Sequence, residues 1–373
     1  MSDRTPHNTR PDLAAPALAL KAKAIVVVGG SGFIGCNLAD SFLQEGEDVV
    51  ILDNLSRAGV ERNLDWLVGN HGRSVHPAIA DIRDLTAIEP VLKDAKAVFH
   101  FAAQTAVTTS LQRPIEDFET NARGTLNILE AARRYGRPPV IFASTNKVYG
   151  TLEEMRLREA RNRYVPADEA VRSLGVSETQ PLDLRTPYGC SKGVADQYVL
   201  DYARSYGLAT AVLRMSCVYG PRQFGTEDQG WVAHFLIRAL AGEPISIYGD
   251  GKQVRDILHV GDAVAAYRAV LKSIDRLGGC AFNLGGGPVN AVSLNEVLHE
   301  IELLTNRPVA TVGSDWRAGD QLFFVADTRA LQKAVGWKAR MDWRRGLRDL
   351  HAWLIKEWTE ASASKHSPRR VSA

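Results

Sequence analysis

The chain has 373 residues, a formal net charge of +2, 45% hydrophobic residues and 24% charged residues. These values are ordinary for a soluble globular protein, and they argue against an acidic disordered chain and against a protein that binds the nucleic-acid backbone, which usually carries a clear basic excess. The cysteines are widely and irregularly spaced, so we expect free thiols in a reducing compartment and neither a CxxC metal site nor a secreted disulfide framework.

The N-terminal residues 1–23 are expected to form a flexible extension. They contain a short apolar stretch, but Asp3 and Asp12 spoil the basic region of a secretory signal, and Pro16 breaks the apolar core. No apolar run of the chain approaches the roughly 18 residues that a membrane span needs. The protein is therefore expected in the cytoplasm, with no membrane partner.

From residue 24 onward, short apolar runs alternate with segments of helical spacing. Strands are predicted at 25–28, 49–52, 75–80, 98–102 and 140–143, and helices at 33–45, 63–68, 86–92 and 115–135. Fully apolar strands separated by helices are typical of a parallel sheet that is covered on both faces. The expected fold class is therefore α/β, with a doubly wound parallel sheet of the Rossmann type.

The second half of the chain has a less regular pattern. Residues 151–187 are polar and are predicted as a long loop, a feature that is usually functional or disordered. Later helices are predicted at 188–206, 232–241, 262–273, 294–304 and 343–359, and strands at 210–213, 245–248, 281–284 and 323–325. We expect residues 24–218 to form mainly a nucleotide-binding domain and residues 219–361 mainly a smaller α+β lobe, with the two interleaved. Residues 362–373 are polar and basic, and a flexible tail is predicted there.

A glycine-rich motif, GGSGFIG, follows the first predicted strand and opens the first predicted helix. The spacing of Gly29, Gly32 and Gly35 permits a tight turn and a close approach of the backbone to a pyrophosphate, which the amides at a helix N-terminus also attract. Asp53 ends the second predicted strand, where a carboxylate accepts from ribose hydroxyls and favours NAD over NADP. Arg57 is the counter-argument, because it could bind a 2′-phosphate.

Three further segments are expected at the same site. Asp81 and Ile82 follow the third predicted strand, where the acid could meet the adenine amino group or, as an alternative, cap a helix. Mainly small residues end the fourth strand and would let a ribose and a nicotinamide approach the backbone; they are Ala102, Ala103 and Gln104. Asn121 lies in a predicted helix, and it could equally serve to tie two strands together.

The segment TPYGCSK places Tyr188 and Lys192 four residues apart at the start of a predicted helix, so both side chains lie on one face. An ammonium beside a phenol lowers the pKa of the phenol, and a phenolate is a competent general base for an alcohol. In isolation, a tyrosine and a lysine at this spacing are usually an ordinary exposed pair on a helix. Here they follow a dinucleotide-binding loop and five predicted strands, so we favour a catalytic role. The third member should be a hydroxyl at the end of the fifth strand, with Thr145 the candidate and Ser144 its competitor.

Taken together, these motifs resemble the extended short-chain dehydrogenase/reductase family over most of the chain. The resemblance implies a Rossmann domain, bound NAD, a nucleotide-diphosphate sugar in the C-terminal lobe, and a homo-oligomer, either a dimer or a tetramer. It also implies a catalytic set of Thr145, Tyr188 and Lys192. The cofactor contacts that it implies are Gly29, Gly32, Phe33, Ile34, Gly35, Asp53, Asn54, Asp81, Ile82, Ala102, Ala103, Gln104, Asn121, Tyr188 and Lys192.

The residues after the triad threonine bear on the type of reaction. A 4,6-dehydratase usually carries Asp-Glu there to eliminate water, whereas this chain has Asn146 and Lys147, so elimination is disfavoured. Epimerisation needs only oxidation, turnover of the keto-sugar and re-reduction. The strings LDNLSR, TNKVYG, PYGCSKGVADQ, DQGW and GKQVRD are similar to those of CDP-paratose 2-epimerases, also called CDP-tyvelose epimerases.

That finer resemblance implies inversion at carbon 2 of the sugar, in the biosynthesis of lipopolysaccharide O-antigen. A UDP-sugar 4-epimerase or another NAD-dependent nucleotide-sugar oxidoreductase stays open as an alternative. A non-catalytic NAD-binding regulator is disfavoured, because a sensor has no need of the triad.

Two arginines are candidates for binding the substrate diphosphate, because guanidinium groups bond phosphates bidentately. Arg255 is the first candidate and Arg317 the second, and either could instead form a surface ion pair. Cys217 stands where many nucleotide-sugar epimerases carry Asn in RxxNVYGP, and it is either a substrate contact or a core thiol. The resemblance adds Gln223 and Thr145 to the substrate contacts. The histidines are scattered and lack a ligand pattern, so no metal site is expected.

Overall fold

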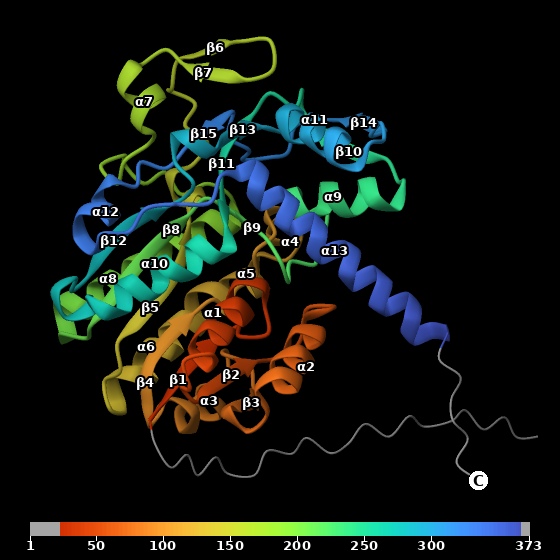
Figure 1. Ribbon diagram of the computed structural model, residues 1–373. Helices are drawn as coiled ribbons and strands as arrows, with labels where there is room; N and C mark the ends of the chain where they lie inside the picture. Colours follow the sequence, from red (N-terminus) through yellow and green to blue (C-terminus); the bar gives the residue numbers. More distant parts are fainter. Residues whose placement is uncertain (1–22, 367–373) are drawn as a thin grey trace, which may run out of the picture.

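A parallel sheet forms the centre of the larger lobe, the lower part of the molecule in Figure 1. The computed structural model describes residues 23–366, and the predictions for residues 1–22 and 367–373 lie outside this range. The seven strands follow the order β12-β8-β5-β4-β1-β2-β3, and each neighbouring pair is parallel. Their bounds are β1 (Ala24–Val28), β2 (Val49–Asp53), β3 (Val75–Ile79), β4 (Ala95–His100), β5 (Val140–Thr145), β8 (Thr210–Met215) and β12 (Cys280–Leu284).

Helices cover both faces of this sheet because alternate strand residues point to opposite faces. Ile25 and Val27 belong to one buried cluster, whereas Val26 and Val28 belong to another. The first cluster includes residues of α1 (Phe33–Leu43), α2 (Val60–His71), α10 (Val260–Lys272) and α12 (Arg329–Val335). The second includes residues of α3 (Leu85–Leu92), α6 (Gly124–Arg134) and α8 (Thr186–Tyr206). The prediction of a doubly wound α/β sheet is confirmed.

The strand order places a topological switch point between β1 and β4. From β1 the chain builds β2 and β3 on one side, and it then returns to β4 on the other. In such sheets ligands bind outside the carboxyl ends of the strands at the point where the order reverses. The glycine-rich loop and the segment after β4 meet at this edge.

The smaller lobe lies above these strand ends (Figure 1). One of its sheets joins β11 (Val254–His259) to β9 (Cys217–Tyr219), β13 (Ala291–Ser293) and β15 (Phe323–Phe324), and a second pairs β10 (Ile245–Tyr248) with β14 (Thr311–Ser314). The helices of this lobe are α9 (Trp231–Ala241), α11 (Leu294–Thr305) and α13 (Trp343–His366). Four of these strands, β9, β11, β13 and β14, were not predicted.

Several predicted elements are wrong in detail. The single helix predicted at 115–135 is broken: it contains α5 (Pro114–Phe118), a π-helical turn at Glu119–Arg123 and α6, and a further helix, α4 (Val107–Gln112), precedes it. The strand predicted at 281–284, assigned to the smaller lobe, is β12 and forms an edge of the larger sheet beside β8. α13 extends to His366, so the tail predicted at 362–373 begins inside a helix.

The long loop predicted at 151–187 contains regular structure. It forms the hairpin β6 (Leu157–Glu159) and β7 (Tyr164–Pro166), followed by α7 (Glu169–Leu174). Arg163 Nε donates to Glu296 at 3.0 Å, and the Tyr164 hydroxyl donates to Asp250 at 2.7 Å. These partners lie far away in the sequence, so the local pattern of the segment did not reveal them.

Short 3₁₀ segments at Gly72–Ser74, Asn146–Tyr149, Ile274–Arg276 and Pro288–Asn290 complete the elements. Within residues 23–366, no helix combines the length and the apolar character needed to cross a bilayer.

Candidate active site

The glycine-rich loop lines a cleft at the carboxyl end of β1, and its glycines are required by close backbone contacts. Gly29 has a φ of +78°, and a Cβ there would lie 2.5 Å from the backbone nitrogen of Ala102. A Cβ at Gly35 would lie 2.3 Å from the carbonyl oxygen of Gly29. Any side chain would therefore fill the cradle that leads to the N-terminus of α1. Such a cradle fits the pyrophosphate of a dinucleotide.

Most of the predicted cofactor residues line this one cleft. They are Gly29, Gly32, Phe33, Ile34, Gly35, Asp53, Asn54, Asp81, Ile82, Ala102, Ala103, Tyr188 and Lys192. The cleft thus runs from the ends of β2 and β3, past the glycine-rich loop, to the two α8 residues. Gln104 and Asn121 are not among its lining residues.

Asp53 is held against the glycine-rich loop. Its Oδ2 accepts from the backbone N–H of Ser31 at 3.0 Å, and its Oδ1 accepts from that of Leu55 at 2.9 Å. Burial raises the pKa of this carboxyl, and the backbone hydrogen bonds oppose the rise. Arg57 lines the same cleft. Asp53, which favours NAD, and Arg57, which could favour NADP, therefore both lie at the end of the cleft where we expect the adenosine ribose of the cofactor.

Asp81 is paired and is not a helix cap. Arg83 Nη2 donates to Asp81 Oδ2 at 2.7 Å and Asn54 Nδ2 donates to the same oxygen at 2.9 Å. The hydrogen bonds from Arg83 hold the pKa of this carboxyl well below its usual range. The cap of α3 is Asp84, whose side chain accepts from two backbone N–H groups. The helix-cap alternative for Asp81 is therefore wrong.

Asn121 connects the segment after β4 to α8. Its Oδ1 accepts from the backbone N–H of Gln104 at 2.9 Å, and its Nδ2 lies 3.0 Å from Ser191 Oγ. Asn121 is 1% exposed and lies in the π-helical turn, a feature that is frequent at functional sites. It ties a loop to the helix that carries the predicted base, and it does not tie two strands together.

Of the three predicted catalytic side chains, Tyr188 and Lys192 line this cleft, and Tyr188 and Thr145 line a larger cavity beside it. Thr145 ends β5, whereas Tyr188 and Lys192 lie in the first turns of α8. The Thr145 hydroxyl and the Tyr188 side chain line the same cavity. Lys192 is 3% exposed, and its Nζ donates to the carbonyl oxygen of Ala143 at 2.7 Å.

The expected lowering of the Tyr188 pKa by Lys192 is not found. Burial raises the pKa of Tyr188 to about 12, and the nearby Thr145 hydroxyl only partly offsets the rise. Burial also lowers the pKa of Lys192 to about 7, against the attraction of Asp196 and Asp117. The ammonium is directed at a backbone carbonyl, and the hydroxyl of Thr145, not Lys192, is the group that opposes the rise in the pKa of Tyr188.

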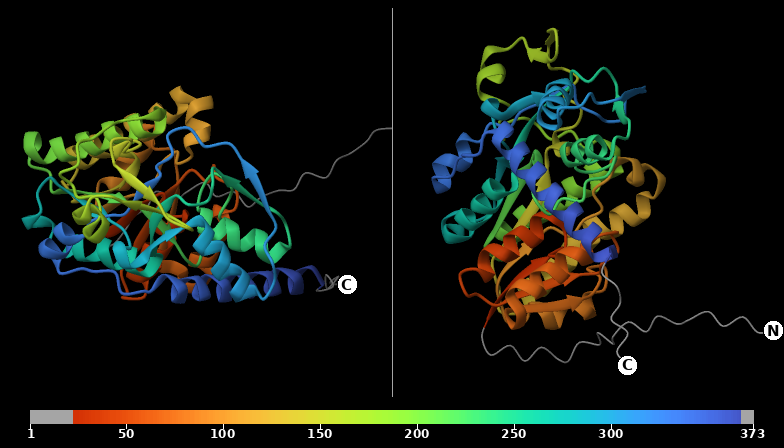
Figure 2. Two further views of the ribbon diagram at one scale, coloured as in Figure 1. Left: turned by 90° about the horizontal axis from the view of Figure 1, so that it is seen from above. Right: turned by 45° about the vertical axis from the view of Figure 1, so that its right-hand side comes forward.

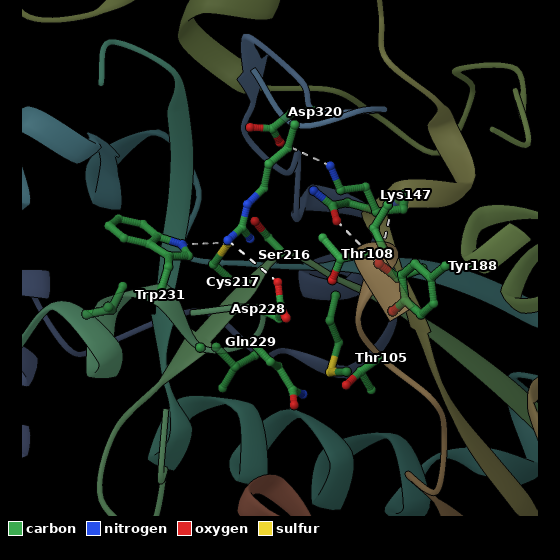
Figure 3. A pocket seen from close by; sticks show the side chains of 18 of the residues that line it. Thr105, Thr108, Lys147, Tyr188, Ser216, Cys217, Asp228, Gln229, Trp231 and Asp320 are labelled. Carbon is green, nitrogen blue, oxygen red and sulfur yellow. Dashed lines mark hydrogen bonds and ion pairs between the residues drawn. The ribbon is translucent and has the colours of Figure 1, made fainter. Parts of the chain in front are cut away.

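A larger cavity opens beside the triad, between the two lobes. Figure 3 shows Tyr188 on one side of it and Trp231 on the opposite side. A second cavity adjoins it and contains Tyr248 and Arg255. The residues that line both cavities are Asn146, Lys147, Cys217, Trp231, Arg317 and Asp320. Together the cavities give room for an extended ligand that reaches from Tyr188 into the smaller lobe.

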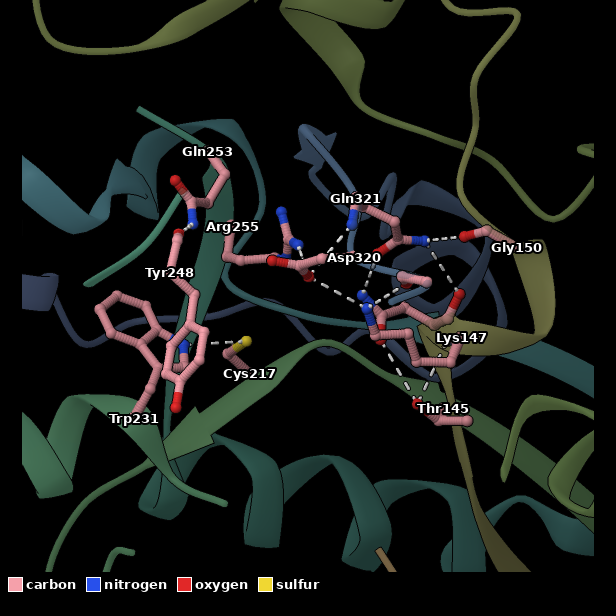
Figure 4. Close-up of polar contacts among 12 residues, drawn as sticks. Thr145, Lys147, Gly150, Cys217, Trp231, Tyr248, Gln253, Arg255, Asp320 and Gln321 are labelled. Carbon is pink, nitrogen blue, oxygen red and sulfur yellow. Dashed lines mark hydrogen bonds and ion pairs between the residues drawn. The ribbon is translucent and has the colours of Figure 1, made fainter. Parts of the chain in front are cut away.

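A carboxylate and two cations lie where the cavities join (Figure 4). Arg255 Nη2 donates to Asp320 Oδ1 at 2.7 Å, and Lys147 Nζ donates to the same oxygen at 3.3 Å from the other side. Arg255 is 6% exposed, so the alternative of a surface ion pair is wrong for it. Sequence reasoning excluded Lys147 as a dehydratase acid but missed that it lines the site together with Asp320.

Arg317, Cys217 and Gln223 also line the large cavity. The Arg317 guanidinium lies 3.9 Å from the Tyr248 ring centroid, and its Nη2 donates to the Glu227 carbonyl at 2.9 Å. Cys217 Sγ accepts from Trp231 Nε1 at 3.3 Å; because Cys217 lines both cavities, it is not a simple core thiol. Gln223 Nε2 donates to a backbone carbonyl, whereas its buried Oε1 has no partner among the described residues.

Two of the histidines, His100 and His259, pair with other protein side chains. Within residues 23–366, no group of three or more His, Cys, Asp or Glu side chains is arranged to hold a metal ion. His100 instead pairs with the Thr125 hydroxyl and His259 with Asp349.

Known proteins of related sequence and structure resemble this chain over nearly its whole length. The CDP-paratose 2-epimerase of Salmonella typhi is 42% identical over 338 residues, which cover 88% of this chain and 98% of the relative. The putative UDP-glucose 4-epimerase of Methanocaldococcus jannaschii is 32% identical over the same shares.

Solved structures give the same result. The UDP-glucose 4-epimerase of Thermotoga maritima with UDP-glucose has a TM-score of 0.77 at 30% identity, covering 90% of this chain and 99% of that one. The Thermus thermophilus UDP-glucose 4-epimerase in complex with NAD has a TM-score of 0.75 at 31% identity, covering 89% and 99%. A family model matches residues 25–285. The chain is therefore an NAD-dependent enzyme and belongs to the NAD-dependent epimerase/dehydratase family.

Proposed function

We propose that this protein is a CDP-paratose 2-epimerase, which interconverts CDP-paratose and CDP-tyvelose by inverting carbon 2 of the sugar. The observation that carries the proposal is the greater identity to the Salmonella typhi CDP-paratose 2-epimerase than to the UDP-glucose 4-epimerases, over almost the full length of both chains. Inversion of a UDP-sugar at carbon 4 is the second candidate, supported by the 4-epimerases among the similar structures.

One feature of the cavity supports epimerisation over elimination of water, and a second distinguishes the site from that of a 4-epimerase. Asn146 and Lys147 follow Thr145, so neither position offers the carboxyl group that elimination of water needs. Cys217 lines the cavity at the position where many 4-epimerases carry Asn, and this difference favours a substrate held differently from that of a 4-epimerase.

In the proposed mechanism, Tyr188 accepts the proton of the reacting hydroxyl, and Thr145 hydrogen-bonds the same oxygen. When bound, NAD supplies the acceptor and donor of the hydride and a positively charged ring that favours the phenolate. Arg255 and Arg317 hold the substrate diphosphate while the planar keto-sugar presents its other face. Tyr188 then returns the proton to the carbonyl oxygen as the carbon regains its hydrogen, so the overall reaction consumes no dinucleotide.

The proposed function leads to three further proposals, on the location of the protein, the pathway that uses its product and its oligomeric state. We place the protein in the cytoplasm and its product in lipopolysaccharide O-antigen biosynthesis. We also propose a homo-oligomer, either a dimer or a tetramer. Exposed apolar side chains on the neighbouring helices α4, α5 and α8 support this assembly; they are Leu111, Ile115, Phe118 and Tyr198. Light scattering on the purified protein measures its size.

The test is to incubate CDP-paratose with the purified protein in heavy water, without added NAD, and to follow the ring protons by NMR. We expect CDP-tyvelose to form with its carbon-2 hydrogen retained. Deuterium at carbon 2 would show exchange with solvent and contradict hydride return. Inversion of UDP-glucose at carbon 4, with CDP-paratose unchanged, would contradict the assigned substrate. In a parallel incubation with added dinucleotide, stoichiometric consumption of that dinucleotide would instead indicate a keto-sugar reductase.

A further inference from the structure

Helix α13 connects the two lobes. Its first turns are anchored in the core of the smaller lobe by Trp343, Leu347 and Leu350. The helix then runs down across the larger lobe, as the right-hand view of Figure 2 shows. There the carboxylate of Glu357 accepts from Arg62 of α2 at 2.6 Å and from Arg222 at 3.3 Å. A residue of the smaller lobe's last helix is thus paired with cations from two other parts of the chain.

Arg222 belongs to the segment 220–230, which links β9 to α9. Its guanidinium carbon lies 3.9 Å from the centroid of the Trp66 ring of α2 and 5.7 Å from that of the Trp353 ring of α13. The Arg222 side chain is 15% exposed, and its backbone has a φ of +72°, a conformation that costs free energy in a residue with a side chain. The stacked tryptophans and Glu357 offset that cost.

Hydrogen bonds from two asparagine side chains connect the backbone of the same segment to the region of the cofactor-binding loop. Asn63 Nδ2 of α2 donates to the Arg222 carbonyl at 3.3 Å and to the Ser31 carbonyl, inside the glycine-rich loop, at 3.1 Å. Asn37 Nδ2 of α1 donates to the Pro221 carbonyl at 3.1 Å. The start of segment 220–230 is therefore linked to the glycine-rich loop through the Asn63 side chain.

Segment 220–230 also reaches the ligand cavities. Gln229 lines the cofactor cleft and the large cavity, and Gln223 lines the large cavity. The Oε1 atoms of both glutamines are buried and have no partner among the described residues. A shift of this segment would therefore open the cleft on the side of the glycine-rich loop and move two side chains of the site.

We propose that the Glu357–Arg222 pair is a latch: it holds segment 220–230 closed over the dinucleotide and so sets how slowly NAD dissociates. Glu357 and Arg222 are positioning residues in this proposal, because they act through the segment. The carboxylate orients the guanidinium between Trp66 and Trp353, which fixes the start of the segment against α2. The inference depends on NAD binding but not on which sugar carbon is inverted.

The test compares Glu357→Gln with a matched variant, Glu300→Gln. Glu300 of α11 pairs with Arg344 of α13 at 2.9 Å, so this control removes the same charge from another ion pair of the same helix, away from the segment. The NAD dissociation rate is measured by diluting the purified holoenzyme into an excess of an enzyme that consumes free NAD, so that released NAD cannot rebind. We expect about a fivefold faster rate for Glu357→Gln, a typical size for coupling between sites, and no change for Glu300→Gln.

A second measurement separates the latch from a general loss of stability. The increase in melting temperature on adding NAD should shrink for Glu357→Gln and stay at the wild-type value for Glu300→Gln. Arg222→Lys keeps the charge but loses the planar group between the tryptophans, and it should also release NAD faster. A purely electrostatic effect of Glu357→Gln on the bound cofactor would slow NAD dissociation, because removing a negative charge favours binding of an anionic dinucleotide. Unchanged or slower release from Glu357→Gln, or equal acceleration in the Glu300→Gln control, would overturn the proposal.

Discussion

The Ser144 hydroxyl donates to Oδ2 of Asp196 at 2.7 Å, so its proton is committed to a buried carboxylate. Asp196 is fully buried and is also bonded by Arg214 through Nε and Nη2, both at 2.9 Å. The hydroxyl of the next residue, Thr145, donates to Asn146 Oδ1 at a longer distance of 3.4 Å and lines the large cavity together with Tyr188. The two neighbouring hydroxyls, which the sequence left as competitors, therefore both line the large cavity but have different partners: Ser144 is bonded to a buried ionic network, and Thr145 to the neighbouring Asn146.

We predict that Thr145→Ala and Ser144→Ala affect different properties. Thr145→Ala removes the partner of the reacting oxygen and should lower kcat by about 10²-fold, with little change in stability. Ser144→Ala should leave kcat nearly unchanged and lower the free energy of unfolding by about 1 kcal/mol, the usual cost of a lost hydrogen bond. Steady-state kinetics and urea unfolding of both variants measure these effects. A loss of kcat confined to Ser144→Ala would reverse the assignment.

Tyr188→Phe tests the proposed base. The variant keeps the ring that packs in the cleft but cannot accept a proton, so kcat should fall by about 10²- to 10⁴-fold. The purified variant should still carry NAD, which its absorbance after denaturation measures, and its melting temperature should stay near the wild-type value. Turnover close to that of the wild type would place the base elsewhere.

Much of the fold was predictable because its signals are local. The strands β1, β2 and β5 are largely apolar runs, and the glycine-rich loop and the Tyr188–Lys192 pair stand at strand or helix ends that the pattern itself marks. The strand β11 was missed because Arg255 and Asp256 interrupt its apolar pattern. Both are buried, at 6% and 0% exposed, and only tertiary partners such as Asp320 explain their burial.

The electrostatics of the site was less predictable. The spacing of Tyr188 and Lys192 places both on one face of α8, but it does not say where the ammonium points. In the structure Lys192 Nζ lies 4.1 Å from the centroid of the Phe142 ring and donates to a backbone carbonyl. The pKa of Tyr188 is therefore governed by burial, a property of the whole fold.

Lys192 should also make the stability of the NAD-free protein depend on pH. Its pKa falls from 10.5 to about 7 on folding, so between these values the folded protein holds fewer protons than the unfolded chain. Stability therefore rises with pH across this window, by up to about 1.4 kcal/mol per pH unit from this one group. The cost of burying the ammonium is fully present below pH 7.

Lys192→Met removes this contribution. We expect the variant to be inactive but more stable than the wild type at pH 6, with a difference that shrinks as the pH rises from 7 to 9. Urea unfolding of both proteins across this range, below the onset of tyrosine titration, measures the difference. A constant difference at all pH values would mean that Lys192 keeps its ordinary pKa in the folded protein.

Asp53 is predicted to select NAD over NADP. Asp53→Ala removes a carboxylate that repels a 2′-phosphate. The affinity for NAD should therefore fall, and the difference between the affinities for NAD and NADP should become smaller. The same variant also loses the bond to Ser31 N, which helps to fix the glycine-rich loop. Asp53→Asn can keep an oxygen for that bond while losing the charge, and it separates the two effects. Wild-type protein that binds NADP as tightly as NAD would show that Arg57 decides the choice.

Arg255 is predicted to bind the substrate diphosphate and to play no part in the proton transfer. Arg255→Lys keeps a cation beside Asp320 but loses the fork that bonds two phosphate oxygens, so KM should rise by about 10-fold or more, with a smaller change in kcat. Arg329→Lys is the matched control, since Arg329 makes a comparable pair with Asp327 at 2.7 Å but its side chain is 63% exposed. Calorimetry completes the test by measuring the affinity for CDP, which carries the diphosphate of the substrate but lacks the sugar that is epimerised. If CDP binds Arg255→Lys as tightly as it binds the wild type, the buried arginine serves only to hold Asp320 and Lys147 in place.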